Sequence, residues 1–428
     1  MTYVEPYICN EIQACACAPG SSLSLDKMAG QDHEAILRNL LDSIAEQLGY
    51  EDHQLTVTPI HTAGANYTSK LFRTTISGKD KEDLKVFGKV ALMGVTLRSQ
   101  VRIRLFETEQ FFYNELANIY ENIQETHGLA TEHKLFFPKF YGYNDTELQE
   151  TIVLEDLSAR GFSCYSRFEA IDWPYAAKAV EEMAKLHALS MAFAKENPEQ
   201  FERLMGNYRF DPKENKNAVE CYWKKMLSSA INACTEDNAR LLESHYGDMD
   251  DSAFVKMRQT LRRPILVHSD FRPSNLMHKI RKDGSLEMIV IDYQLLQAGC
   301  PVYDLLFFIM SGSDAAFRRD HQDRLREHYY EHLRRAMQRL ELDPDEEYSR
   351  ADFDYEWNEM LPNALTMAVF SLPIITVDEE DAPVIDHNTD MNGFAIMRTS
   401  ELFSKRMNEI VSRLPQMGHF DSRMMNGY

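Results

Sequence analysis

Apolar side chains change their spacing several times along the chain, and each change predicts a new element. Between residues 33 and 48 they recur every three to four positions, which predicts a helix that Asp32 can cap and Gly49 can end. Segments rich in Val, Ile, Thr and aromatic residues follow and predict three strands: QLTVTPI, YTSKLFRTTI and LKVFGKVAL. The pattern therefore begins with one helix and a small sheet.

A longer amphipathic stretch, VRIRLFETEQFFYNELANIYENI, predicts the next helix, and KFYGYNDTELQETIVLEDL predicts two more strands. After about residue 156 most apolar residues return to helical intervals, as in EHYYEHLRRAMQRL, which is typical of a solvated helix with one buried stripe. The exception is 264–293, where two strands flank a Lys-Asp-Gly turn. An acidic segment at 377–390 predicts a solvated loop. This order predicts an α+β chain with two lobes, and clefts between lobes are common ligand sites.

Composition narrows the possible partners. Hydrophobic residues make up 44% and charged residues 26% of 428, which is ordinary for a globular protein, but the formal net charge of -21 argues against nucleic acid. No apolar run approaches the roughly 20 residues of a membrane-spanning helix, and the start is a poor signal peptide. Seven cysteines without framework spacing indicate a reducing compartment. We therefore expect a cytoplasmic protein, with Cys15 and Cys17 in a flexible tail rather than a metal site.

Two acidic motifs in the second half carry candidate chemistry. HSDFRPSN at 268–275 precedes the hairpin, and IVIDYQ at 289–294 ends it. Oxygen ligands from Asn275 and Asp292 suit Mg²⁺, which takes its remaining ligands from water and phosphates. Asp270 could then orient an acceptor hydroxyl and accept its proton late in the reaction, while His268 holds the loop in shape. His-x-Asp alone is more often structural, so the added Asn and Asp favour catalysis.

Phosphoryl transfer also needs a cation on the donor phosphates. Lys89, in the apolar strand VFGKVAL, could reach the α- and β-phosphates and pair with a glutamate on the following helix. Glu109 is favoured for that pairing over Glu107 and Glu115, and Lys85 competes with Lys89.

The bend before the second strand is a candidate phosphate cover. Backbone N–H groups near Gly64 and Asn66 could lie over the phosphates. An ordinary turn explains Gly64 equally well.

Together these parts resemble the kinase signature of a strand lysine, an H-x-D-x-x-x-x-N loop and a metal-binding aspartate. DYQ in place of DFG, without an APE-type segment, separates the chain from protein kinases. It is similar instead to small-molecule kinases such as choline and aminoglycoside kinases, and it most resembles the ecdysteroid kinase-like family. The motifs that carry this resemblance follow in order from about residue 60 to 310: GANYTSKLFR, FETEQFFY, VLEDLSARGF, HSDFRPSN, LMHKI and IDYQLLQAGCPVYDLLFF.

The resemblance implies a bilobal, protein-kinase-like α+β fold. A flexible tail would cover 1–30, and an N-lobe with a small sheet and one long helix would cover 31–156. A mainly helical C-lobe with the catalytic loop and the metal-binding hairpin would cover 157–428. The implied cofactors are ATP and Mg²⁺.

The resemblance also implies roles for individual residues. Asp270 would be the catalytic base, Asn275 and Asp292 the Mg²⁺ ligands, and Lys89 with Glu109 the phosphate-binding pair.

Three further residues, Glu155, Asp156 and Leu157, fall in the segment that would meet adenine, and Asp304 would brace the catalytic loop.

Two residues depart from the family pattern. Ser269 replaces a glycine, a harmless exchange if its backbone φ is negative. Arg272 replaces a frequent aromatic residue and could neutralise the transferring phosphoryl group or contact the acceptor.

The expected activity is transfer of the γ-phosphoryl group of ATP to a hydroxyl of a small molecule. The resemblance suggests an ecdysteroid, for example at its C22 hydroxyl, or a related steroid, secondary metabolite or xenobiotic alcohol. A choline- or aminoglycoside-type kinase and a catalytically silent binding protein are the alternatives. A carboxylate-rich acceptor site would favour a cationic acceptor, and an apolar, aromatic one a steroid. The sequence leaves the oligomeric state open.

Overall fold

The fold is described from a computed structural model. It covers residues 32–413 apart from 63, 65, 101–103, 210–215, 248–255, 257, 259–260, 384, 387, 391–392 and 394–397. The tail expected over 1–30 and its cysteines lie outside these residues. Within the described part of the chain, no helix is both long enough and apolar enough to cross a membrane.

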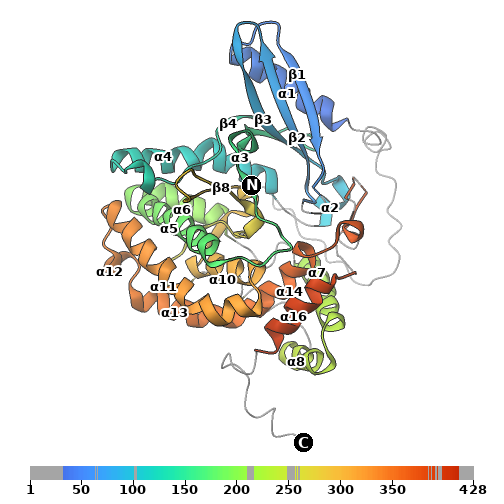
Figure 1. The fold of residues 1–428 in the computed structure, drawn as a ribbon, viewed down its shortest axis with the longest axis vertical. Coiled ribbons are helices and arrows are strands. Elements are labelled where there is room, and N and C mark those ends of the chain that lie inside the picture. The colour runs from blue at the N-terminus through green and yellow to red at the C-terminus, as the bar shows by residue number, and fades with distance from the viewer. Residues whose placement is uncertain are drawn as a thin grey trace, which may run out of the picture.

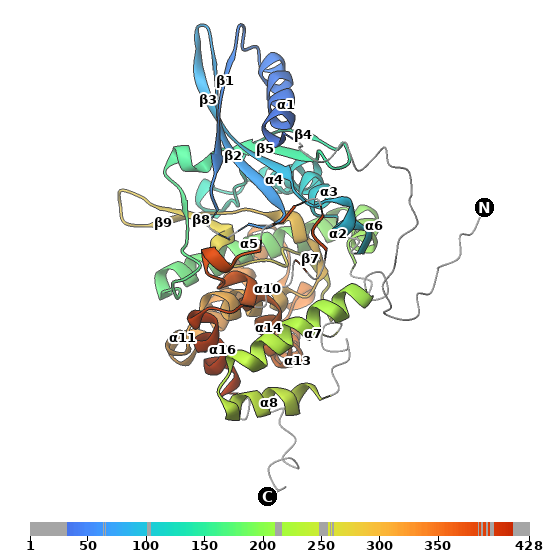
Figure 2. The same ribbon diagram turned by 90° about the vertical axis from the view of Figure 1, so that its right-hand side faces the viewer.

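A five-stranded antiparallel sheet forms the N-terminal part (Figures 1 and 2). Its spatial order is β1-β2-β3-β5-β4, so the two strands that follow the long helix add to the edge of the first three. Because β3 lies between β2 and β5, its middle is hydrogen-bonded on both sides. The strands are β1 (Gln54–Ile60), β2 (Ser69–Gly78), β3 (Lys81–Ala91), β4 (Phe140–Asn144) and β5 (Thr151–Glu155).

Helix α1 (His33–Gln47) covers one face of this sheet. The Asp32 carboxylate caps it by accepting hydrogen bonds from two backbone N–H groups, as the sequence predicts. Leu37 and Leu41 of its apolar stripe pack in a separate small core with Phe72 and Val153 of the sheet. The amphipathic pattern of the helix therefore decides which face of the sheet it covers.

The long amphipathic run after the short helix α2 (Val95–Gln100) forms one nearly continuous helix. It consists of α3 (Leu105–Phe111), a π-helical turn (Phe112–Leu116) and α4 (Ala117–Thr126). In the π turn, Phe112 is fully buried and stacks on Tyr293, the middle residue of the DYQ motif. A π turn often marks a functional site, and this one joins the helix to the second acidic motif.

The C-terminal part is mainly helical, with α5 and α11 side by side in it (Figure 1). Residues 356–370, whose apolar residues recur at helical intervals, do not form one helix, because the helix breaks at Leu361–Asn363, where Pro362 cannot donate a helical hydrogen bond. The helices are α5 (Trp173–Glu196), α6 (Pro198–Asn207), α7 (Lys216–Ala233), α8 (Glu236–Tyr246), α10 (Pro301–Gly312), α11 (Ala315–Arg339), α12 (Pro344–Glu347), α13 (Arg350–Met360), α14 (Ala364–Ile375) and α16 (Glu401–Val411).

Short strands within the helical part carry the two acidic motifs. β7 (Ile265–Val267) pairs with β10 (Gln297–Gly299), and β6 (Ser163–Cys164) pairs with the hairpin of β8 (Leu276–Ile280) and β9 (Leu286–Val290). The predicted α+β architecture, a sheet followed by a mainly helical part, is confirmed.

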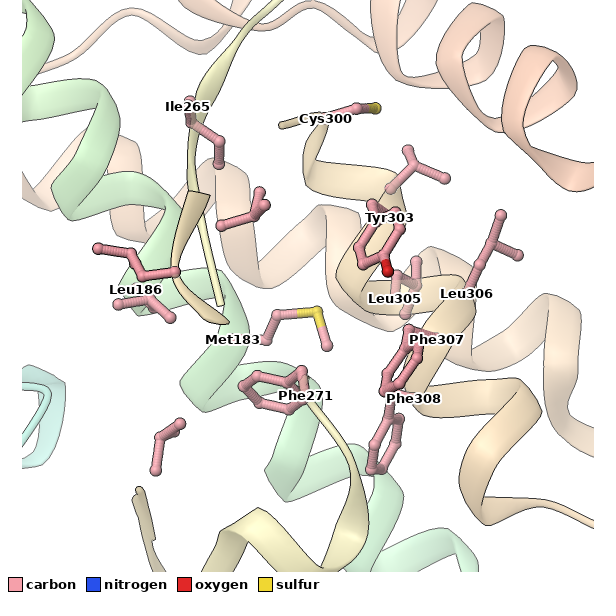
Figure 3. Packing of buried hydrophobic residues seen from close by; sticks show 14 of the residues in the cluster. Met183, Leu186, Ile265, Phe271, Cys300, Tyr303, Leu305, Leu306, Phe307 and Phe308 are labelled. Atoms are coloured by element: carbon pink, nitrogen blue, oxygen red, sulfur yellow. The ribbon is translucent and has the colours of Figure 1, made fainter. Parts of the chain in front are cut away.

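A large core anchors the HSDFRPSN loop from behind. Figure 3 shows Phe271 close to Met183 of α5 and Phe308 of α10. Phe271 is fully buried, and its ring meets that of Phe308 edge to face. Burying such a ring contributes about 1.5–3 kcal/mol, so the loop is held by packing as well as by hydrogen bonds.

The acidic segment at 377–390 exposes its charges and also packs against the β1–β2 bend. Val377 is fully buried and packs with Ile385 against Tyr67 of the β1–β2 bend. The Oε1 atom of Glu379 lies 2.5 Å from Nε2 of His61, which belongs to the same bend. The acidic residues Asp378, Glu379, Glu380 and Asp386 are exposed, as predicted, while the apolar residues between them give the segment a packing face.

Candidate active site

A cavity of about 1280 Å³ lies between the sheet and the helical part. Strand β3, helix α3 and the segment after β5 line it from the N-terminal side, and the HSDFRPSN and DYQ segments line it from the helical side. The two halves of the predicted site therefore share one cavity.

Lys89 is the amine at its centre. Its Nζ donates hydrogen bonds to Oε2 of Glu109 at 2.7 Å and to Oδ1 of Asp292 at 2.8 Å, and the side chain is only 7% exposed. Burial by itself would lower the pKa of Lys89, but the charges of Asp292 and Glu109 raise it above its ordinary value. The lysine thus stays charged and links the sheet to the DYQ motif.

The rival candidates lie elsewhere. Lys85, four residues earlier on β3, is exposed, and so are Glu107 and Glu115. Of the glutamates weighed from the sequence, Glu109 is the one that contacts Lys89.

One amine and two carboxylates meet at this point, and the surrounding charges decide which carboxylate stays ionised. Burial raises the pKa of Glu109 to about 7, against the opposing charge of Lys89. Burial acts in the same sense on Asp292, but there the charge and the hydrogen bond of Lys89 prevail and lower the pKa. We therefore expect Asp292 to remain ionised, with Glu109 as the group that takes up a proton near neutral pH.

The HSDFRPSN loop is organised around Asp270. Its Oδ2 accepts hydrogen bonds from Nδ2 of Asn275 at 2.8 Å and from Nε of Arg272 at 3.2 Å. His268 does not face the cavity. Its Nε2–H donates to the carbonyl of Ile291 at 3.0 Å, and its Nδ1 accepts from the Asp270 backbone at 3.2 Å, so it holds the loop to the DYQ strand.

Asp304 braces this loop from α10. Its two oxygens accept the backbone N–H groups of His268 and Ser269, both at 2.8 Å. Its Oδ2 also lies 3.1 Å from Nε2 of His187, a fully buried residue of α5. His187 is thus part of the packed core.

Ser269 does not meet the condition under which its exchange for glycine would be harmless. Its φ is +66°, in the left-handed region that side chains with a Cβ avoid. The side chain is 1% exposed, and its hydroxyl has no hydrogen-bond partner among the described residues. The two hydrogen bonds to Asp304 impose a glycine-like conformation on a serine.

The donor set of Asn275 and Asp292 fits a hard cation. The Nδ2 group of Asn275 donates hydrogen bonds to Asp270. In the described structure no donor contacts the Oδ1 of Asn275. The Oδ1 of Asp292 accepts a hydrogen bond from Lys89. Its Oδ2 has only a long contact, of 3.5 Å, with Nε2 of Gln294. One oxygen on each residue is thus left for a ligand, and oxygen donors are what Mg²⁺ requires.

The remaining predicted nucleotide contacts divide into two groups. Glu155, Asp156 and Leu157 line the cavity, although the backbone N–H groups of Glu155 and Asp156 already donate to carbonyls of Lys139 and Lys85, at 2.8 and 3.2 Å. An adenine edge would therefore need other groups of this segment, such as those of Leu157.

In the bend, Asn66 lines the cavity and donates to the carbonyl of Ser69, which stabilises the turn. Gly64 has φ of +75°, and a Cβ added there would meet Cβ of Ala382 at 2.7 Å. Its packing against the acidic segment accounts for the glycine without a phosphate.

Sequence reasoning missed Gln294. Its Oε1 accepts hydrogen bonds from Lys89 at 3.1 Å and from the Thr68 hydroxyl at 3.3 Å, while Nε2 reaches Asp292. It thus connects the bend, the lysine and the DYQ aspartate. The DYQ motif contains this residue, but a comparison with DFG marks the Gln only as a departure from the kinase pattern.

The rest of the described cavity wall combines aromatic and aliphatic side chains with five arginines, Arg73, Arg104, Arg167, Arg209 and Arg258. The carboxylates that line it are Glu109, Glu155, Asp156, Asp270 and Asp292, all in the motifs above. Beyond these motifs the described wall has no carboxylate. Its larger apolar and aromatic side chains include Tyr67, Phe87, Tyr165, Phe168, Tyr208, Tyr222, Tyr303, Phe307, Phe370 and Ile374.

Known proteins were compared with the chain at the levels of structure and sequence. Similar solved structures include a GDP complex of a mutant aminoglycoside 2'-phosphotransferase-IIIa (TM-score 0.45, 10% identity, 89% of this chain and 99% of that one). They also include the wild-type GDP complex and a GDP and kanamycin complex, each with TM-score 0.36, at 11% and 12% identity, and each covering 77% of this chain and 98% of the other. Among curated proteins none matches significantly. A model of the ecdysteroid kinase-like family matches residues 63–342, about two thirds of the chain, and the protein therefore belongs to the ecdysteroid kinase-like family.

Proposed function

We propose that this protein transfers the γ-phosphoryl group of ATP, with Mg²⁺, to a hydroxyl of a small, uncharged, largely apolar alcohol such as an ecdysteroid or a related steroid. Family membership makes it a small-molecule kinase of the ecdysteroid kinase-like type. The proposal adds the nucleotide, the metal, the residue roles and the acceptor class.

One observation carries the proposal. The Lys89 amine of the sheet contacts both Glu109 and Asp292, so groups suited to phosphate and to a cation meet in the cavity that also contains Asp270. Phosphoryl transfer depends mainly on positioning and charge neutralisation, and this arrangement can supply both.

Each residue has a defined task in this mechanism. Lys89 binds the donor phosphates. Asn275 and Asp292 would hold Mg²⁺, which neutralises phosphate charge when bound. Asp270 orients the acceptor hydroxyl and takes its proton as the new O–P bond forms and the bond to the β-phosphate oxygen breaks, releasing ADP. Arg272, next to Asp270, adds positive charge where the phosphoryl group passes.

The cavity wall supports an uncharged acceptor over a cationic one. A choline- or aminoglycoside-type acceptor would need carboxylates in its own part of the pocket, and the described wall has them only in the motifs that serve nucleotide, metal and catalysis. Five arginines also line the described wall, Arg73, Arg104, Arg167, Arg209 and Arg258, and their charge would repel a cationic acceptor. Aromatic and aliphatic side chains provide apolar surface for a steroid-like or similar xenobiotic alcohol.

The test is a direct assay. The protein is incubated with ATP–Mg²⁺ and a panel of ecdysteroids, plant sterols, choline and an aminoglycoside, and products are examined by mass for phosphate adducts. We expect adducts on one or more steroid alcohols, and Asp270→Asn should lower the rate by about 10²- to 10⁴-fold. Asp283→Asn, at the exposed tip of the hairpin, is the matched control and should leave the rate unchanged.

Two results would contradict the proposal. Phosphorylation of choline or the aminoglycoside alone would reject the acceptor class. Absence of any stabilisation by ATP–Mg²⁺ in a thermal-unfolding titration would favour a silent binding protein instead.

A further inference from the structure

A second cluster of metal-binding side chains lies outside the active site, between α5 and α11. It consists of Glu181 on α5 and of His328 and His332 on α11, whose ligand atoms all lie within 4.8 Å of one another. The Glu181 Oε1 is 3.1 Å from Nε2 of His328 and 3.8 Å from Nε2 of His332. The cluster belongs to none of the motifs that define the proposed kinase site.

The helices bring these residues together. His328 and His332 are four residues apart, so both project from one face of α11, and their ring centroids are 4.3 Å apart. Helix α5 lies beside α11 (Figure 1) and contributes Glu181. Because both elements are long helices with large buried faces, the spacing of the three groups is set by a rigid framework.

The distances suit a transition-metal ion. In a tetrahedral zinc site with bonds of about 2.0–2.1 Å, neighbouring ligand atoms are about 3.3 Å apart. The carboxylate-to-imidazole separations of 3.1 and 3.8 Å lie on either side of that value. Small rotations of the two rings would place both Nε2 atoms around one ion, with water as the fourth ligand.

Lys178, the nearest lysine, is mainly engaged elsewhere. Its Nζ is 2.6 Å from Glu182 and 3.5 Å from Glu181. Glu181, His328 and His332 are each about a quarter exposed, so an ion from solvent can reach them.

We propose that Glu181, His328 and His332 form a binding site for one divalent transition-metal ion of the zinc class. The ion joins α5 to α11 close to the brace of the catalytic loop. Tyr329, next to His328, and His187 of α5 are hydrogen-bonded at 2.7 Å, and His187 in turn contacts Asp304. The expected role is therefore structural, since the ion stabilises the helix pair behind the proposed active site.

The test measures metal binding directly and needs no substrate. The test uses protein without a polyhistidine tag, in which serine replaces Cys9, Cys15 and Cys17. Metal is removed from this protein with EDTA, and the protein is then titrated with metal in the absence of nucleotide. Cobalt(II) is followed by its visible absorption, and zinc by calorimetry. We expect one ion per chain with a Kd of about 10 µM or tighter, and addition of zinc should raise the thermal unfolding temperature.

Variants assign the ion to the cluster. Glu181→Gln and His332→Ala should each weaken binding at least about tenfold. His321→Ala, two turns earlier on α11, and Asp292→Asn, in the cavity, should leave it unchanged. Circular dichroism of the metal-free proteins checks folding, and the nearly isosteric Glu181→Gln decides the outcome if His332→Ala does not fold.

Three outcomes would overturn the site: no binding at about 100 µM metal, binding unaffected by Glu181→Gln and His332→Ala, or binding lost in Asp292→Asn. The third would place the ion in the cavity. None of these outcomes depends on kinase activity, so the proposed function stands or falls separately.

Discussion

Replacing Ser269 by glycine should stabilise the protein. Ser269 has φ of +66° and a buried hydroxyl without a hydrogen-bond partner in the described structure. A side chain with a Cβ in the left-handed region costs about 1–2 kcal/mol, and an unsatisfied buried hydroxyl costs about 1–3 kcal/mol. Glycine offsets part of this gain, because its freer unfolded chain costs about 0.5–1 kcal/mol. We expect Ser269→Gly to raise the free energy of unfolding by about 1–4 kcal/mol.

Two matched variants separate the contributions. Ser269→Ala removes the hydroxyl but keeps the Cβ, so it should be less stable than Ser269→Gly by about 0.5–1 kcal/mol, which is the backbone contribution alone. Ser274→Gly, in a right-handed turn of the same loop, relieves no strain and should destabilise the protein by about 0.5–1 kcal/mol.

Urea unfolding followed by tryptophan fluorescence is the appropriate assay. The three tryptophans, Trp173, Trp223 and Trp357, all lie in the helical part, as Ser269 does. With a slope of about 3 kcal/mol/M, a gain of 1 kcal/mol moves the midpoint by about 0.3 M. The reasoning is refuted if Ser269→Ala is as stable as Ser269→Gly, or if glycine lowers the midpoint.

Three other predictions concern the buried charges. Lys89→Met should lower kcat/KM by at least about 10²-fold. It should also lower the free energy of unfolding in urea by about 3–5 kcal/mol, because two buried carboxylates lose their partner. Lys85→Met, at an exposed position, should change neither quantity. The pKa of Glu109 is raised to about 7 in the folded protein, so its ionisation opposes folding. The stability of wild type relative to Glu109→Gln should therefore fall as pH rises from about 4.5 to 7 and level off above, and a flat difference would exclude the raised pKa. Asp304→Asn should lower the free energy of unfolding by about 2–4 kcal/mol in the same assay. A buried amide cannot accept hydrogen bonds from both loop N–H groups without burying an unpaired donor. An unchanged urea midpoint would contradict the bracing role of Asp304.

Gln294→Leu tests the residue that sequence reasoning missed. Loss of its contacts should lower kcat/KM about tenfold by loosening Lys89 and Asp292, with little effect on unfolding. Steady-state kinetics with the identified acceptor measures it, and unchanged kinetics would limit Gln294 to a local structural role.

The sequence by itself determined the local structure and the family. Periodicity placed the first helix, the five strands and their order before the helical part, because the backbone geometry of each element imposes its own spacing of apolar residues. The motifs around Lys89, Asp270 and Asp292 pointed to one family, and the match over 63–342 confirms it.

Only the tertiary structure decided how distant residues pair. Three glutamates on one helix were candidates for Lys89, and the orientation of that helix against β3 selected Glu109. The positive φ of Ser269 follows from its hydrogen bond to Asp304, 35 residues away, which no local pattern records. Likewise, the contact of Glu181 with His328 spans 147 residues. Such pairings depend on how helices and strands pack against one another. Packing involves the whole chain, so the spacing of residues within one segment does not reveal it.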